Sequence, residues 1–182
     1  MNIVKLFFFI ITTMVLSSCQ NRPEVLVKPQ QFFDLKVFFS QEQERLKNIN
    51  RLNKKALIDG ILEEKTTEGL NLKEELALFI DSDINKVSWL DKYEADSTFN
   101  DGVLTQIVYQ AKEDQLKTNR LTVHFEQERV DSIDIIRKAS SLAAELEQRL
   151  IYLPDIGYSI ESRQKTSFSE AHVLKLDVQF VR

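Results

Sequence analysis

The sequence predicts an α+β fold, with an N-terminal helix and a second helix packed on one face of an antiparallel β-meander. After residue 31, apolar residues first recur every three or four positions, which is the period of an amphipathic helix. From Trp89 onward they alternate with polar residues, which is the period of a strand with one buried face. The 182 residues include only four glycines and three prolines, which argues against long loops.

The first helix is predicted to begin at about residue 30. Phe32, Leu35 and Phe39 follow one another at helical spacing. After a polar gap, further apolar residues extend the same stripe: Leu46, Ile49, and Leu52 or Asn53. The doublets Phe32-Phe33 and Phe38-Phe39 are interpreted as core residues. The alternative interpretation is that they line a groove or a membrane-facing patch.

The dipeptide Asp59-Gly60 is the next structural signal and allows two interpretations. Gly60 can end the first helix at its C-terminal cap. The pair can instead form a two-residue hairpin turn, because short apolar runs flank it on both sides. We favour the hairpin. A second helix is then predicted from about Asn71 to Ile80, with an apolar stripe formed by Leu72, Leu76, Phe79 and Ile80.

The rest of the chain reads as strands. Four segments alternate between apolar and polar residues: 103–111, 121–126, 131–137 and 174–180. Such alternation, with short polar turns between the segments, is typical of an antiparallel meander with one covered face. Residues 141–153 have a strong helix propensity, but their apolar residues also share one strand face. We favour a strand there, followed by a turn at 154–157.

The N-terminus has the layout of an export signal. Lys5 precedes an apolar run from Leu6 to Leu16, which is too short for the roughly 20 residues that span a bilayer as a helix. The sequence Leu16-Ser17-Ser18-Cys19 then resembles the lipobox of bacterial lipoproteins. That resemblance implies cleavage of the signal after Ser18 and lipidation of Cys19. The alternatives are an ordinary cleaved signal that leaves a free cysteine, and an uncleaved anchor.

The resemblance also implies a cellular location. Gln20 follows the cysteine, which is similar to lipoproteins sorted to the outer membrane, with the domain in the periplasm and surface exposure left open. The expected organisation is a signal peptide over 1–18, a tether over 19–31 and a single α+β domain over 32–182. The twelve residues of the tether after Cys19 contain Pro23 and Pro29 and reach roughly 40 Å when extended.

Two segments of the body, residues 79–93 and 157–165, resemble a group of small uncharacterised Gram-negative lipoproteins. The first contains Phe79-Ile80-Asp81-Ser82-Asp83-Ile84-Asn85-Lys86 with Trp89 and Tyr93, and the second is Gly157-Tyr158-Ser159-Ile160-Glu161-Ser162-Arg163-Gln164-Lys165. This resemblance implies no activity.

Composition restricts the partners of the mature chain. Loss of residues 1–18 removes one cation, Lys5, and so changes the net charge from −4 to −5. This charge argues against nucleic acid, which requires a concentrated basic surface. Cys19 is the only cysteine, so the mature body has no disulfide framework and no cysteine nucleophile once that thiol is acylated. The predicted membrane partner is reached through the lipid anchor.

No catalytic, metal or cofactor site is predicted in the body. His124 and His172 lack a second ligand at metal-binding spacing. Asp81-Ser82-Asp83 is interpreted as a helix end, with a hard-cation site as the alternative. Glu161, Arg163 and Lys165 are expected on a solvated strand face, with a partner-docking patch as the alternative.

The sequence therefore predicts a non-enzymatic accessory or interaction module of the cell envelope, with no cofactor. The alternative function is a carrier for a lipid or another apolar ligand, held where a curved sheet closes over the four phenylalanines. The residues that would bind such a ligand or a protein partner cannot be named from the sequence.

Overall fold

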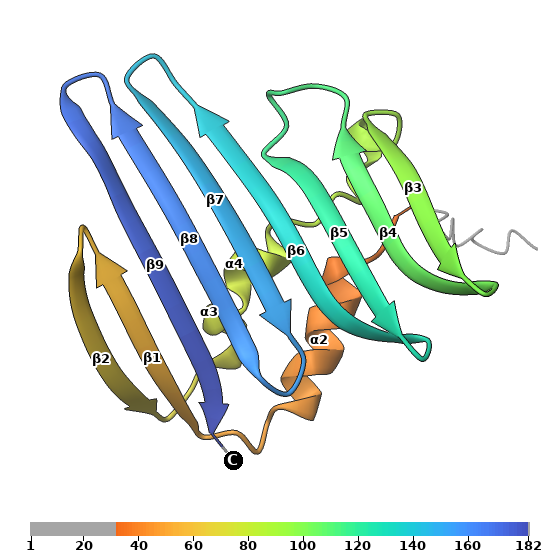
Figure 1. Cartoon of the computed structure of the whole chain (residues 1–182), viewed down its shortest axis with the longest axis horizontal. Coiled ribbons are helices and arrows are strands. Elements are labelled where there is room, and N and C mark those ends of the chain that lie inside the picture. The colour runs from red at the N-terminus through yellow and green to blue at the C-terminus, as the bar shows by residue number, and fades with distance from the viewer. Residues whose placement is uncertain (1–31, 182) are drawn as a thin grey trace, which may run out of the picture.

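In the computed structural model, which describes residues 32–181, a nine-stranded antiparallel sheet carries a thin helix layer on one face (Figure 1). Strands hold 58% of the described residues and helices 15%. The predicted α+β class is therefore wrong, because the fold is predominantly β. The residues of the predicted lipobox, Leu16, Ser17, Ser18 and Cys19, and the predicted tether lie outside the described residues.

The strands follow one another along the chain except at one point. The sheet order is β2-β1-β9-β8-β7-β6-β5-β4-β3, so the last strand returns to pair with the first. The strand bounds are β1 (Arg51–Ile58), β2 (Ile61–Glu68), β3 (Tyr93–Asn100), β4 (Val103–Ala111), β5 (Thr118–Glu126), β6 (Arg129–Ser140), β7 (Ala144–Leu153), β8 (Gly157–Thr166) and β9 (Ser169–Val181).

Several local predictions are confirmed. Asp59 and Gly60 form the turn of the β1–β2 hairpin, both with positive φ angles of 47° and 86°, as a two-residue hairpin turn requires. The ambiguous segment 141–153 contains strand β7, which pairs with β6 and β8 over its length. Pairing on both sides outweighs its helix propensity.

The helices differ from the prediction. Helix α2 (Leu35–Arg45) is capped at its N-terminus by Asp34, whose side chain accepts a hydrogen bond from the Val37 amide at 2.8 Å. It ends at Arg45, so the predicted extension to Leu52 is wrong. Leu46, Ile49 and Leu52 are all buried, but in a turn and in β1. These three residues are apolar because they enter the same core as the helix. Their spacing matches a helical period although they are not helical.

The second predicted helix is divided into two short ones. Helices α3 (Leu72–Glu75) and α4 (Ala77–Ile80) meet at Leu76, and a short 3₁₀ helix, η2 (Val87–Trp89), follows. Among the helices of residues 32–181, none is long and apolar enough to cross a membrane.

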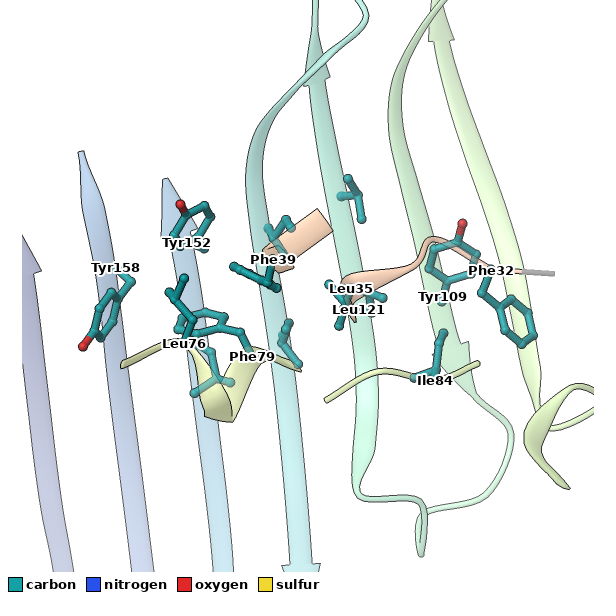
Figure 2. Packing of buried hydrophobic residues seen from close by; sticks show 14 of the residues in the cluster. Phe32, Leu35, Phe39, Leu76, Phe79, Ile84, Tyr109, Leu121, Tyr152 and Tyr158 are labelled. Carbon is teal, nitrogen blue, oxygen red and sulfur yellow. The ribbon is translucent and has the colours of Figure 1, made fainter. Parts of the chain in front are cut away.

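An aromatic cluster joins the helices to the sheet (Figure 2). The ring of Phe39 from α2 lies 5.3 Å from that of Phe79 in α4 and 5.0 Å from that of Tyr152 in β7, measured between centroids. All three side chains are buried. Residues 20–182 include every residue of this core.

Two tyrosine–carboxylate hydrogen bonds fasten the helix layer to the sheet. The Tyr152 hydroxyl donates to Glu42 of α2, and the Tyr158 hydroxyl donates to Glu75 of α3, each at 2.5 Å. The two tyrosines are direct partners across β7 and β8. Burial raises the pKa of both tyrosines, so they remain protonated donors at neutral pH.

Candidate binding surface

The two faces of the sheet differ sharply in charge. In antiparallel strands, directly paired residues and every second residue share a face. On β7 and β8 the face beneath the helices carries Tyr152, Tyr158 and only uncharged residues. The charged residues of these strands all lie on the opposite, outward face: Glu145, Glu147, Arg149, Glu161, Arg163 and Lys165.

The helix-bearing face continues beyond the helix layer. In Figure 1, β6 to β9 extend toward the top of the view, past α2, α3 and α4. The same face carries Ile58 of β1, Ile61 of β2, Leu146 of β7 and Leu174 of β9, which we call the open shelf. Ile58 is 43% exposed and Ile61 is 68% exposed, and the other two are partly exposed. Next to the shelf on β1 and β2, this face also carries the charged residues Lys54, Glu63 and Lys65.

The register of the strands orders the residues of the shelf. Ile61 pairs with Ile58, and Ile58 pairs with Leu174. The same row then crosses β8, β7 and β6 through Ser162, Gln148 and Arg137. At about 4.8 Å between neighbouring strands, this row of six strands is about 24 Å long. It therefore changes from apolar at the β2 edge to neutral polar and then to cationic.

Arg137 closes the row with a buried guanidinium group. Its Nη2 donates to Asp81 at 3.1 Å, and Lys117 binds the same carboxylate. Nε and Nη1 of Arg137 have no hydrogen-bond partner among residues 32–181. Burial lowers the pKa of Arg137, whereas the hydrogen bond from Lys117 lowers the pKa of Asp81. Two cations thus share one carboxylate at this end of the shelf.

The four phenylalanines of the N-terminal segment divide between the core and a groove. Phe32 and Phe39 are buried, so the core interpretation is confirmed for them. Phe33 and Phe38 are partly exposed and line a groove of about 670 Å³ between α2 and the turns of two hairpins, together with Phe125. Arg45 and Glu42 also line it and are bonded to each other at 2.7 Å. The sheet therefore does not enclose all four phenylalanines in one cavity.

The charged residues singled out in β8 lie on the outward face, as expected. Arg163 and Lys165 line a hollow of about 790 Å³ together with Glu145 and Glu147 of β7, Leu146 of the open shelf, and residues of the loop between β4 and β5. Glu161 instead accepts a hydrogen bond from Lys175 at 3.0 Å. This face is a mixture of charges of both signs, in contrast to the open shelf on the other side.

The remaining candidate residues have structural partners. Asp81 follows the last residue of α4, so the interpretation as a helix end is confirmed. His172 in β9 is bonded at 2.8 Å to Asp59 in the turn of the β1–β2 hairpin. His124 is partly exposed on the outward side of β5. Within residues 32–181, no group of three His, Cys, Asp or Glu side chains could hold a metal ion.

Comparison of the chain with known proteins found no matching family model, no matching curated protein and no matching solved structure.

Proposed function

We propose that the chain is a lipid-anchored binding protein of the cell envelope, which holds an apolar ligand on the open shelf. The observation that carries the proposal is the apolar row of Ile61, Ile58 and Leu174 on the helix-bearing face, in which Ile58 and Ile61 are exposed. Apolar surface that a ligand covers contributes about 25 cal/mol per Å². Exposed apolar patches of this kind are typical of binding sites.

The shelf fits a ligand better than the space beneath the helices. There the side chains of Phe39, Phe79 and Leu76 are fully buried and fill the layer between helices and sheet. A ligand on the shelf needs no displacement of this core. The proposal thus keeps the carrier function but moves its site away from the phenylalanines.

The shelf can be tested on a single hairpin. Replacing Ile58 and Ile61 together by serine is expected to weaken binding of dansyl-undecanoic acid at least tenfold, or about 1.4 kcal/mol, since both contact surfaces are lost. Fluorescence titration of residues 20–182 measures this. The matched control replaces Leu57 and Leu62, which pair on the opposite face of the same hairpin.

The control variant is expected to bind as the wild type does. Equal weakening in both variants would place the effect in hairpin stability and refute the shelf. Absence of binding by the wild type would leave the second candidate function, an interaction module that docks a protein. That candidate is favoured by the hollow beside Arg163 and Lys165, which charged residues of both signs line.

The proposed anchor rests on the lipobox resemblance and has its own test. Replacing Cys19 by alanine removes the thiol that would carry the lipid. We expect the variant to leave the membrane fraction and to lose palmitate labelling, because stable anchoring needs the attached acyl chains. A variant that stays in the membrane fraction and still labels with palmitate would contradict the anchor.

A further inference from the structure

Two hairpin turns at the end of the sheet away from the helices carry large apolar side chains in full exposure. Leu142 lies between β6 and β7 and is 105% exposed, and Phe168 lies between β8 and β9 and is 94% exposed. Both turns are at the top of Figure 1, whereas α2, α3 and α4 lie lower in the view, behind the sheet. Neither side chain supports the core, so their apolar character has no role in folding that the structure shows.

The two turns hold each other in place. The Ser167 amide donates to the Ala143 carbonyl at 3.0 Å, which links the β8–β9 turn to the β6–β7 turn. Within the β6–β7 turn, the Ser141 hydroxyl accepts hydrogen bonds from the Ala143 and Ala144 amides at 3.3 and 3.1 Å. Leu142 and Phe168 are therefore presented from adjacent, internally bonded turns.

We propose that Leu142 and Phe168 dock this end of the domain on the surface of a lipid bilayer. The two side chains protrude, so they fit a surface into which they can insert rather than a ligand that needs a pocket. Aromatic and aliphatic side chains of this kind anchor proteins at the boundary between headgroups and acyl chains. Both side chains can insert into a bilayer at once, because a bilayer needs no complementary binding pocket.

Charge indicates which kind of bilayer is bound. The charged residues beside the two turns are of both signs: Lys138, Glu145, Lys165 and Glu170. With a net charge of −5 on the mature chain, attraction to anionic lipid supplies little. Docking is therefore driven by apolar insertion, and we expect it on neutral phosphatidylcholine and in high salt.

Docking would also bring the open shelf to the membrane. Leu146 of the shelf lies in β7, close in sequence to Leu142 in the turn that precedes this strand. The shelf therefore extends toward the docking end. The inference stands without the shelf, because it depends only on the two turns.

Vesicle flotation of residues 20–182, which lack the predicted anchor, tests the docking. We expect the wild type to float with phosphatidylcholine vesicles at 0.1 and 0.5 M salt, and the variant with Leu142→Ser and Phe168→Ser to bind at least tenfold more weakly. The control variant replaces Phe99 and Ile156, which are also exposed but lie elsewhere, and should float like the wild type.

Two results would overturn the docking proposal. The first is a wild type that does not float, and the second is a double variant that floats as well as the control. If the wild type does not float and the double variant changes its oligomeric state, the two turns form a protein contact instead. The double variant should still bind dansyl-undecanoic acid in solution, so failure of docking and failure of the shelf are distinguishable.

Discussion

Replacing Gly157 by alanine is expected to destabilise the fold by about 3–5 kcal/mol, near the upper limit for a single substitution. A Cβ atom at this position would lie 1.9 Å from the Val178 carbonyl oxygen and 2.9 Å from its carbon. Both are backbone atoms of β9, so no side-chain rotation relieves the overlap. The backbone of Gly157 also has a φ of +149°, which residues with a side chain rarely adopt.

The position of the clash explains why the effect should spread. Gly157 begins β8, and β8 pairs with both β7 and β9. Displacing β9 to make room would disturb the next residue of β8, Tyr158, which holds Glu75 of α3. It would also disturb the hydrogen bond from the Phe180 amide to the Ile156 carbonyl at 2.9 Å.

Urea unfolding followed by circular dichroism measures this loss, and Gly102→Ala is the matched control. Gly102 also has a positive φ, +80°, but a Cβ there meets no atom within 4 Å. The control therefore retains the conformational cost of about 1–2 kcal/mol without the overlap. Equal unfolding midpoints for the two variants would show that β9 tolerates the added methyl group.

The strands could be predicted because their signals are local. Alternation along residues 121–126 and 174–180 depends only on which face of each strand is buried, and Asp59-Gly60 with short apolar runs on both sides favours a two-residue hairpin turn. The N-terminal helix was predicted too long for a physical reason. Leu46, Ile49 and Leu52 enter the same core from a turn and a strand, and their spacing happens to match a helical period.

The candidate surfaces could not be predicted, because exposure depends on which elements are covered. Leu174 and Val178 follow the same apolar–polar alternation in β9 and lie on the same face. Only Val178 is buried, because the helix layer covers that part of the strand. Likewise, the amino-acid sequence of residues 141–143 and 167–168 does not indicate that the two turns are in contact. Pairing of β7 with β8 and of β8 with β9 brings them together.

Phe39→Ala is expected to cost about 3–5 kcal/mol, since its buried ring touches both helices and sheet and its removal leaves a cavity. Phe168→Ala, at a turn, is the control and should change the unfolding free energy by less than about 0.5 kcal/mol. Urea unfolding measures both, and a small loss for Phe39→Ala would mean that the helix layer adds little to stability.

The same variant tests where the apolar ligand lies. Removing the Phe39 ring opens space between α2, Phe79 and Tyr152, at the opposite end of the sheet from the exposed turns. If the ligand lies on the open shelf, dansyl-undecanoic acid should bind Phe39→Ala and the wild type equally under conditions in which both are folded. Tighter binding by Phe39→Ala would place the ligand beneath the helices, because only there does the substitution create an apolar cavity.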